Sequence, residues 1–148
     1  MKILFVCTGN TCRSPMAEGI FNFLQKQQSS NSFSSSAGIM VIPGSCVSKY
    51  SVDALKQYNT DISDHIPKQI DKNLISENDL VLTMSQSHKD YLENLFPEFS
   101  DKIYTLGEYT SGGDIQDPYG GSFNLYKQCA DDIYCAIKVL IEKIKENE

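Results

Sequence analysis

Near the N-terminus, an apolar run is followed at once by a short turn and a helix start. Ile3–Val6 is a continuous apolar run of strand length, which is typical of a buried β-strand. Gly9 and Asn10 come soon after it, and both residue types tolerate the positive φ of a tight turn. Ser14 can then cap a helix whose first turn includes Pro15. We therefore expect a strand, a tight loop and a helix N-terminus in direct succession.

The two ends of this loop carry the side chains Cys7 and Arg13. Arg13 is the only arginine among thirteen basic residues. Its planar fork of N–H donors matches two phosphate oxygens at once, which a lysine cannot do. A loop at a helix N-terminus also directs backbone N–H groups at an anion. The pattern predicts a phosphate-binding loop with Cys7 as its nucleophile. The alternative is a buried structural Cys7 and a surface Arg13.

Residues 7–14, followed by Pro-Met-Ala-Glu, resemble the signature of the low-molecular-weight protein tyrosine phosphatase family. Three later segments also resemble the family, so the likeness covers nearly the whole chain: Ser36–Gly38, Asp79–Ser85 and Asp117–Tyr119. The last of these resembles the Asp-Pro-aromatic loop that supplies the catalytic acid. The branch most similar to this chain is the bacterial protein arginine phosphatases.

Strands and helices are expected to alternate, which predicts an α/β fold: a three-layer structure in one domain, residues 1–148, with a four-stranded parallel sheet and helices on both faces. Strands are expected over 2–6, 32–36, 80–84 and 102–106, and helices over 15–28, 48–58, 87–96 and from Ser122 to the C-terminus. The phosphate loop follows the first strand. In such sheets ligands bind at the carboxyl ends of the strands, so Cys7 and Asp117 are expected to meet there.

The resemblance implies the roles of the site residues. Cys7 would attack phosphorus to give a phosphocysteine, Arg13 would hold the phosphoryl oxygens, and Asp117 would act as general acid and then base. Residues expected to bind or frame the substrate are Thr8, Gly9, Asn10, Thr11, Cys12, Ser14 and Tyr119. Within this set, Asn10 would brace the loop and Ser14 would hydrogen-bond the Cys7 thiolate.

Several neighbouring residues have competing interpretations. Asp114 is a rival acid, although no proline follows it to fix its backbone. His65 lies in a segment similar to one that braces the phosphate loop in relatives, but lysine replaces an arginine there, so a surface histidine is the alternative. His88, at a helix start, is expected at the surface. Tyr126 is expected to pack in the core.

Three functions compete. The first is hydrolysis of phosphorylated protein side chains. The second is thiol-dependent arsenate reduction, but residues 80–100 lack the additional cysteines that it requires. The third is a silent phosphate-binding module, which would not need Cys7, Arg13 and Asp117 together. For the hydrolase, the family resemblance implies that Thr11 decides most of the substrate choice, because the tyrosine-specific branch usually has a bulky aliphatic residue there. We expect a preference for phosphoarginine, with phosphotyrosine as the alternative.

Composition limits the partners and the compartment. A net charge of −6 argues against a nucleic-acid partner, and no apolar run is long enough to span a membrane. Five cysteines, one of them in a thiolate site, favour the reducing cytoplasm. We expect phosphorylated proteins as substrates, phosphate as product, no cofactor, no metal and a monomer. Cys12 is expected to form a reversible disulfide with an oxidised Cys7.

Overall fold

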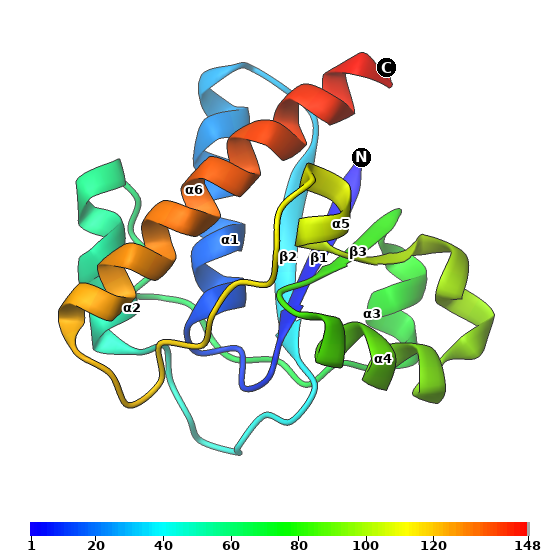
Figure 1. Ribbon diagram of the computed structural model, residues 1–148, viewed down its shortest axis with the longest axis horizontal. Helices are drawn as coiled ribbons and strands as arrows, with labels where there is room; N and C mark the ends of the chain where they lie inside the picture. The colour runs from blue at the N-terminus through cyan, green and yellow to red at the C-terminus, as the bar shows by residue number, and fades with distance from the viewer. Residues whose placement is uncertain (148) are drawn as a thin grey trace.

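The computed structural model, which describes residues 1–147, has a parallel four-stranded sheet at its centre (Figure 1). The strand order is β2-β1-β3-β4. The strands are β1 (Lys2–Cys7), β2 (Phe33–Gly38), β3 (Leu80–Thr83) and β4 (Ile103–Thr105). The predicted α/β sheet is confirmed, and β1 lies inside it, paired with β2 on one side and with β3 on the other.

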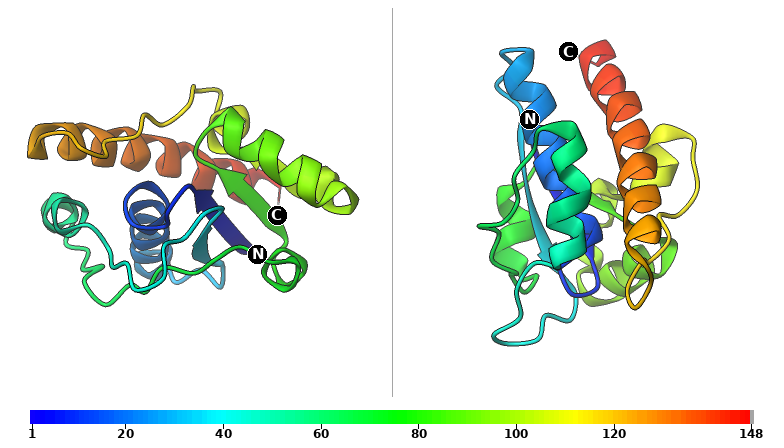
Figure 2. Two further views of the ribbon diagram at one scale, coloured as in Figure 1. Left: turned by 90° about the horizontal axis from the view of Figure 1, so that it is seen from below. Right: turned by 90° about the vertical axis from the view of Figure 1, so that its left-hand side faces the viewer.

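Helices cover both faces of the sheet, as the two views in Figure 2 show. The α-helices are α1 (Arg13–Gln27), α2 (Lys49–Leu55), α3 (Lys72–Glu77), α4 (Gln86–Leu95), α5 (Leu106–Thr110) and α6 (Phe123–Glu146), with short 3-10 helices η1 (Lys56–Tyr58) and η2 (Pro97–Lys102). Residues of α1, α2, α5 and α6 share one buried cluster with the sheet, and residues of α3 and α4 share the other. None of the helices in the described part is long and apolar enough to cross a membrane.

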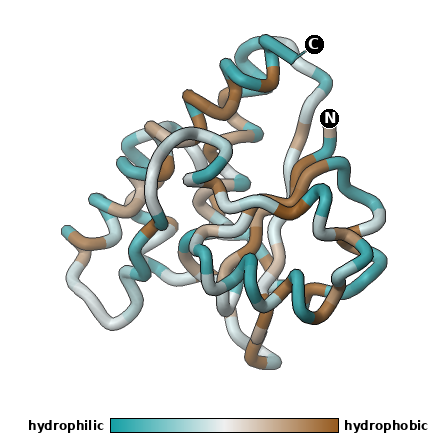
Figure 3. Tube along the Cα trace, turned by 45° about the vertical axis from the view of Figure 1, so that its right-hand side comes forward, coloured by the Kyte–Doolittle hydropathy of each residue, from teal (hydrophilic) through white to brown (hydrophobic). Residues whose placement is uncertain are grey.

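The alternation of side chains along β1 builds the two halves of the core. Ile3 and Phe5 point to the face covered by α1 and α6, whereas Leu4 and Val6 point to the face covered by α3 and α4. The first strand is therefore apolar on both sides, and this central stretch is brown in Figure 3. Burial on both faces explains why the sequence shows a continuous apolar run there and not an alternating one.

The start of α1 differs from the sequence prediction. The helix begins at Arg13, and the residue before it, Cys12, occupies the cap position without a side-chain hydrogen bond. Ser14 lies buried inside the first turn and is not the cap, because its hydroxyl is hydrogen-bonded within the phosphate loop instead. The sequence favours an apolar stripe of Met16, Ile20, Phe23 and Leu24 along this helix. In the structure it is Phe21 that is buried in the core, packed edge-on against Phe5, whereas Phe23 is half-buried.

Two short helices were not expected from the sequence. In α3, Asp71 caps the helix by accepting a hydrogen bond from the Leu74 amide. In α5, Thr105 and Glu108 form a reciprocal capping box. The last helix starts where it was predicted, with Ser122 as the cap of α6. The sequence also favours one buried face for this helix, because apolar residues recur every three or four positions along it. The residues of this face are all buried: Tyr126, Cys129, Ile133, Ile137, Leu140 and Ile144.

Candidate active site

The phosphate loop lies at the carboxyl end of β1 and leads directly into α1. Cys7 is buried, and its Sγ lies 2.9 Å from the Ser14 hydroxyl oxygen. Asn10 adopts the predicted left-handed conformation, with φ of 58°. Gly9 does not have a positive φ among the residues described, so the one left-handed residue at Asn10 suffices to turn the loop.

Asn10 is the buried centre of the loop's support. Its Nδ2 donates to the hydroxyls of Ser14 and Ser36, at 2.8 and 2.9 Å. Its Oδ1 accepts from the Lys68 backbone amide and lies 2.9 Å from His65 Nε2. Four hydrogen bonds therefore hold one side chain, and through it the loop, against β2 and the segment that contains His65.

His65 therefore braces the loop and is not a plain surface residue. Its ring Nδ1 lies 3.9 Å from the Glu18 carboxylate, and Glu18 also accepts a 2.6 Å hydrogen bond from Ser36. Burial lowers the pKa of His65, while Glu18 opposes that shift. Lys68, which replaces the arginine of the similar family segment, contributes its backbone amide to Asn10.

Gly38, the last residue of β2, lets the loop approach the sheet. A Cβ added at Gly38 would lie 2.6 Å from the Thr8 carbonyl oxygen and 3.0 Å from the Asn10 nitrogen. The next two amides, of Ile39 and Met40, donate to the carbonyls of Cys7 and Thr8. The backbone after β2 therefore continues alongside the loop, at a distance that leaves no room for a side chain.

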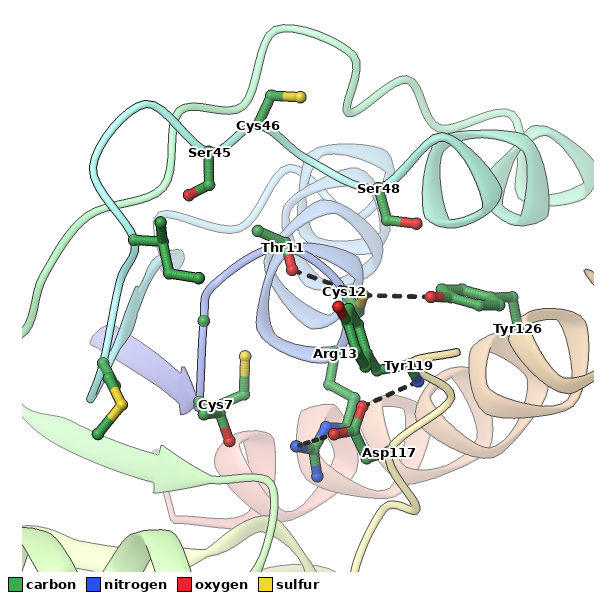
Figure 4. Close-up of a pocket in the computed structure, with 14 residues that line it drawn as sticks. Cys7, Thr11, Cys12, Arg13, Ser45, Cys46, Ser48, Asp117, Tyr119 and Tyr126 are labelled. Carbon is green, nitrogen blue, oxygen red and sulfur yellow. Dashed lines mark hydrogen bonds and ion pairs between the residues drawn. The ribbon is translucent and has the colours of Figure 1, made fainter. Parts of the chain in front are cut away.

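Arg13 and Asp117 are in contact at this end of the sheet, and Asp117 borders the same cavity as Cys7, the residue that it was expected to meet. Arg13 is buried, and its Nη1 donates to the Ile115 carbonyl at 3.0 Å. Its Nη2 lies 3.6 Å from Asp117 Oδ2, and Asp117 Oδ1 accepts from the Tyr119 amide (Figure 4). The loop that contains Asp117 is also anchored on the sheet, because the Ile115 amide donates to the Met84 carbonyl just after β3.

Asp114, the rival acid, is directed elsewhere. Its Oδ1 accepts from the Gln86 amide at the start of α4, and Asp114 does not border the cavity that contains Cys7. Asp117 does border that cavity, and its side chain is 52% exposed. The geometry therefore favours Asp117 as the proton donor.

A cavity of about 510 Å³ opens above Cys7 (Figure 4). Asn10 and Ser14 lie behind the loop and support it without lining this cavity. Tyr119 is 81% exposed and stands at the edge, and Tyr126 is buried with its hydroxyl 3.8 Å from Cys12 Sγ. The lining residues are Cys7, Thr8, Gly9, Thr11, Cys12, Arg13, Met40, Ile42, Ser45, Cys46, Ser48, Asp117, Tyr119 and Tyr126.

His88 is the residue that sequence reasoning placed wrongly. It is only 3% exposed, and its ring lies beneath the phosphate loop, hydrogen-bonded to Thr8 and Ser85. Ser85 at the start of α4 is a residue type typical of a helix cap, and this pattern says nothing about burial. The burial of His88 depends on how α4 packs against the phosphate loop, which the local sequence does not show. Burial, and next the nearby Arg13, lower the pKa of His88 to about 4.

Neither a disulfide nor a group of metal ligands is found among the described residues. Burial raises the pKa of Cys129 to about 12, so this thiol stays protonated. All five cysteines are free. Within residues 1–147, no group of three or more His, Cys, Asp or Glu side chains is arranged to hold a metal ion.

Comparison with known sequences identifies the family of this chain. The sequence model described as low molecular weight phosphotyrosine protein phosphatase matches residues 2–148. The chain belongs to this family. Members of the low molecular weight phosphatase family are enzymes, and the family predicted from the sequence is confirmed.

Relatives within the low molecular weight phosphatase family carry two kinds of name. A protein-arginine-phosphatase of Bacillus subtilis is 37% identical, with 99% of each chain covered. A low molecular weight protein-tyrosine-phosphatase, PtpB of Staphylococcus epidermidis, is 38% identical, with 98% of this chain and 97% of the relative covered.

Solved structures show the same fold. A low molecular weight protein tyrosine phosphatase from T. tengcongensis superimposes with a TM-score of 0.94 at 46% identity, covering 97% of this chain and 99% of that one. A mutant of the YwlE arginine phosphatase, in which an active-site serine is phosphorylated, gives 0.95 at 35% identity, covering 100% and 98%. The fold is therefore shared with both kinds of phosphatase.

Proposed function

We propose that this chain is a cysteine-dependent protein phosphatase that prefers phosphoarginine to phosphotyrosine. The observation that carries the proposal is the meeting of three side chains at one cavity. Cys7 comes from the end of β1, Arg13 from the start of α1, and Asp117 from the loop before α6. A nucleophile, a phosphate clamp and a proton donor are the groups that phosphoryl transfer through a covalent intermediate needs.

The first half of the reaction transfers the phosphoryl group to sulfur. Arg13 and the loop amides hold the nonbridging oxygens, and the Cys7 thiolate attacks phosphorus. The new S–P bond forms as the P–N bond of phosphoarginine breaks. Asp117 gives its proton to the leaving nitrogen, so the arginine side chain departs with its normal complement of protons.

The second half releases phosphate. A water attacks phosphorus on the face vacated by the leaving group, and Asp117 now accepts a proton from it. The S–P bond breaks, and the Cys7 thiolate is restored. Ser14, 2.9 Å from Cys7 Sγ, is positioned to donate a hydrogen bond to that thiolate in both halves.

The contact between Arg13 and Asp117 belongs to the free enzyme. A bound phosphoryl group would take over the guanidinium fork, because its charge-assisted hydrogen bonds are shorter and stronger than an ion pair at 3.6 Å. Asp117 would then turn toward the leaving group. Its half-exposed position allows that movement without disturbing the core.

The preference for phosphoarginine rests on Thr11. This residue lines the cavity, and its hydroxyl is hydrogen-bonded only weakly, at 3.6 Å from Cys12 Sγ. A hydroxyl at this position can orient a phosphoramidate or the incoming water, whereas a bulky aliphatic side chain would crowd a guanidinium. Asp117 can also accept hydrogen bonds from guanidinium N–H groups. The relatives named as arginine phosphatases support the proposal.

Two other activities are the alternatives. Phosphotyrosine hydrolysis is favoured by relatives of equal identity that are named tyrosine phosphatases. Arsenate reduction would need a relay of further cysteines beside the site. Outside the phosphate loop, the cysteines are Cys46, Cys129 and Cys135, and none of them lies between residues 80 and 100.

The test is a comparison of kcat/KM on matched phosphoarginine and phosphotyrosine peptides. We expect the native enzyme to prefer phosphoarginine and the Thr11→Ile variant to lose that preference by roughly ten- to two-hundred-fold while keeping its activity on an aryl phosphate. A native preference for phosphotyrosine that Thr11→Ile leaves unchanged would reject the arginine assignment. Loss of all turnover in Cys7→Ser, with phosphate binding retained, is the control for the nucleophile.

The same proposal includes the setting of the enzyme. We infer a single-domain monomer that acts on phosphorylated proteins in the cytoplasm and binds no nucleic acid. The net charge of −6 and the five free cysteines support it. Light scattering of the full chain measures the oligomeric state, and a dimer at micromolar concentration would contradict the inferred monomer.

A further inference from the structure

The loop residue next to the nucleophile is fixed from two sides. On one side, the Thr8 carbonyl accepts from the Met40 amide at 2.9 Å. On the other side, Thr8 Oγ1 lies 2.8 Å from His88 Nε2, across 80 residues of sequence. The orientation of the Thr8 peptide group, which links Cys7 to the rest of the amide cradle, therefore depends on both contacts.

The His88 ring is itself locked in place. Its Nδ1 lies 2.8 Å from the Ser85 hydroxyl oxygen, and Ser85 caps α4 by accepting from the His88 amide. A neutral imidazole has one donor nitrogen and one acceptor nitrogen, whereas a hydroxyl can either donate or accept. The Thr8 and Ser85 hydroxyls can therefore satisfy both ring nitrogens, whichever of the two carries the proton. With 3% of its surface exposed, the ring connects the start of α4 to the floor of the cavity without contact with bulk water.

Charged groups around the ring favour its neutral form. Arg13 repels a proton on the ring, while Asp114 and Asp117 attract one, and burial has the largest effect. With a pKa of about 4, His88 is uncharged at neutral pH. A neutral ring keeps Arg13 as the positive group of the site and leaves both ring nitrogens free for their hydroxyl partners.

We propose that His88 is a positioning residue of the reaction: through its hydrogen bond to the Thr8 side chain it holds the first residue of the phosphate cradle in the orientation that the transition state requires. The inference rests on the proposed phosphatase activity, but not on the choice between arginine and tyrosine. Amides that are fixed in advance stabilise developing charge without reorganisation. A less rigid cradle should therefore lower kcat more than it weakens substrate binding.

Two substitutions separate this role from simple packing. In His88→Gln, the amide end of the side chain is as many bonds from Cβ as Nε2 is, so it can still reach Thr8. In His88→Asn, the amide corresponds to Nδ1, which preserves the contact with Ser85 but cannot reach Thr8. Both variants replace the ring by an open-chain amide and disturb the core. They differ in the contact that they keep, because Gln can retain the one with Thr8 and Asn the one with Ser85.

The experiment measures kcat and KM for p-nitrophenyl phosphate with the native chain, the two variants, Thr8→Val and the double variant Thr8→Val/His88→Asn. We expect His88→Asn and Thr8→Val each to lower kcat on the order of tenfold, with KM changed less, and His88→Gln to remain within about threefold of native. The double variant should be no slower than the slower single variant, because both changes remove one contact.

A spectroscopic measurement accompanies the kinetics. The Thr8 side chain reaches the surface, so Thr8→Val keeps the fold even if the buried Asn variant does not. The ring nitrogen resonances of His88 are recorded for the native chain and for Thr8→Val, each with and without inorganic phosphate. Relative to the native chain, the Nε2 resonance should shift in Thr8→Val, whereas the Nδ1 resonance should stay nearly constant. Unchanged Nε2 resonances would overturn the proposal.

The kinetic outcomes also distinguish failure of the positioning role from failure of the proposed phosphatase activity. Equal activity of His88→Asn and His88→Gln, a native rate for Thr8→Val, or losses that multiply in the double variant would each overturn the positioning role. Absence of p-nitrophenyl phosphate hydrolysis by the native chain would instead count against the proposed phosphatase itself.

Discussion

At the scale of single residues, the proposed role of Asp117 requires its carboxylate to leave Arg13 and turn toward the substrate. In the free enzyme its carboxylate faces Arg13, and a backbone amide of its own loop holds its second oxygen. The proline that follows it fixes the backbone, while the side chain stays half exposed. Mobility of the carboxylate within a fixed loop is what a group that first gives and then takes a proton requires.

Asp117→Ala should slow hydrolysis in proportion to how poorly the leaving group departs. We expect a loss of roughly 10²- to 10⁴-fold for an alkyl phosphate, and a much smaller loss for an activated aryl phosphate that needs no proton. The measurement is kcat across a series of esters of increasing leaving-group pKa. A uniform loss along the series would show that Asp117 is not the acid.

We predict that Cys12 protects Cys7, the proposed nucleophile, from irreversible oxidation. Both thiols border the same cavity, and Cys12 Sγ is held between the hydroxyls of Thr11 and Tyr126. Mild peroxide should inactivate the enzyme reversibly, because Cys12 can trap the Cys7 sulfenic acid as a disulfide. In Cys12→Ser, inactivation should become irreversible. Mass spectrometry that finds a Cys7 sulfonate beside a free Cys12 in the native chain would contradict this.

At the scale of elements, the end of β2 controls the shape of the phosphate loop. The carboxyl end of this strand forms backbone hydrogen bonds to the loop, and only a glycine leaves room for them. The loop is thus shaped as much by a neighbouring strand as by its own sequence.

Gly38→Ala should therefore damage catalysis without unfolding the protein. The new methyl group would lie 2.6 Å from the Thr8 carbonyl oxygen, so the loop must shift. A displacement of about 1 Å near the nucleophile costs roughly a hundredfold in kcat/KM. Gly113→Ala is the matched control, because a Cβ there meets nothing within 4 Å. Equal activity of the two variants would argue against a shaping role for Gly38.

Elements with a strong local signal could be predicted from the sequence, and those defined by their neighbours could not. The apolar run of β1 and the periodic apolar residues of α6 are local patterns, and the predicted bounds of both elements agree closely with the structure. α3 has a single buried residue, Ile75, and so no periodicity to detect. The Thr105–Glu108 capping box was a signal for α5 that could have been used. The burial of His88 follows from packing between α4 and the loop, which no local pattern expresses.

At the scale of the whole molecule, the sheet brings together residues that are far apart in the chain. The loops after β1 and β3 are joined by the Ile115 backbone, which donates to Met84 and accepts from Arg13. The site is thus held by tertiary contacts on every side, and its stability depends on the stability of the fold.

The stability of the fold should fall in mild acid because of the buried histidines. In the unfolded chain His88 gains a proton below about pH 6.5, whereas the folded protein resists protonation until about pH 4. Acidification between these values favours unfolding, and the loss from pH 7 to pH 5 is about 2 kcal/mol from this residue. The pKa of His65 is lowered in the same direction.

Urea unfolding of the native chain and of His88→Gln at pH 7 and pH 5 measures this effect. The carboxylates contribute equally to both proteins, so the difference between their pH slopes isolates His88. The variant should lose less stability on acidification than the native chain. Parallel pH dependences would mean that the pKa of His88 does not differ between the folded and unfolded states, contrary to the lowered value.

The one arginine of this chain is enclosed in its own active site, 6% exposed. Every other basic position is lysine. A phosphatase that acts on phosphoarginine, as proposed for this chain, would itself be open to arginine phosphorylation if it carried an exposed arginine. Because its only arginine is buried, this protein has no exposed arginine side chain that could be phosphorylated.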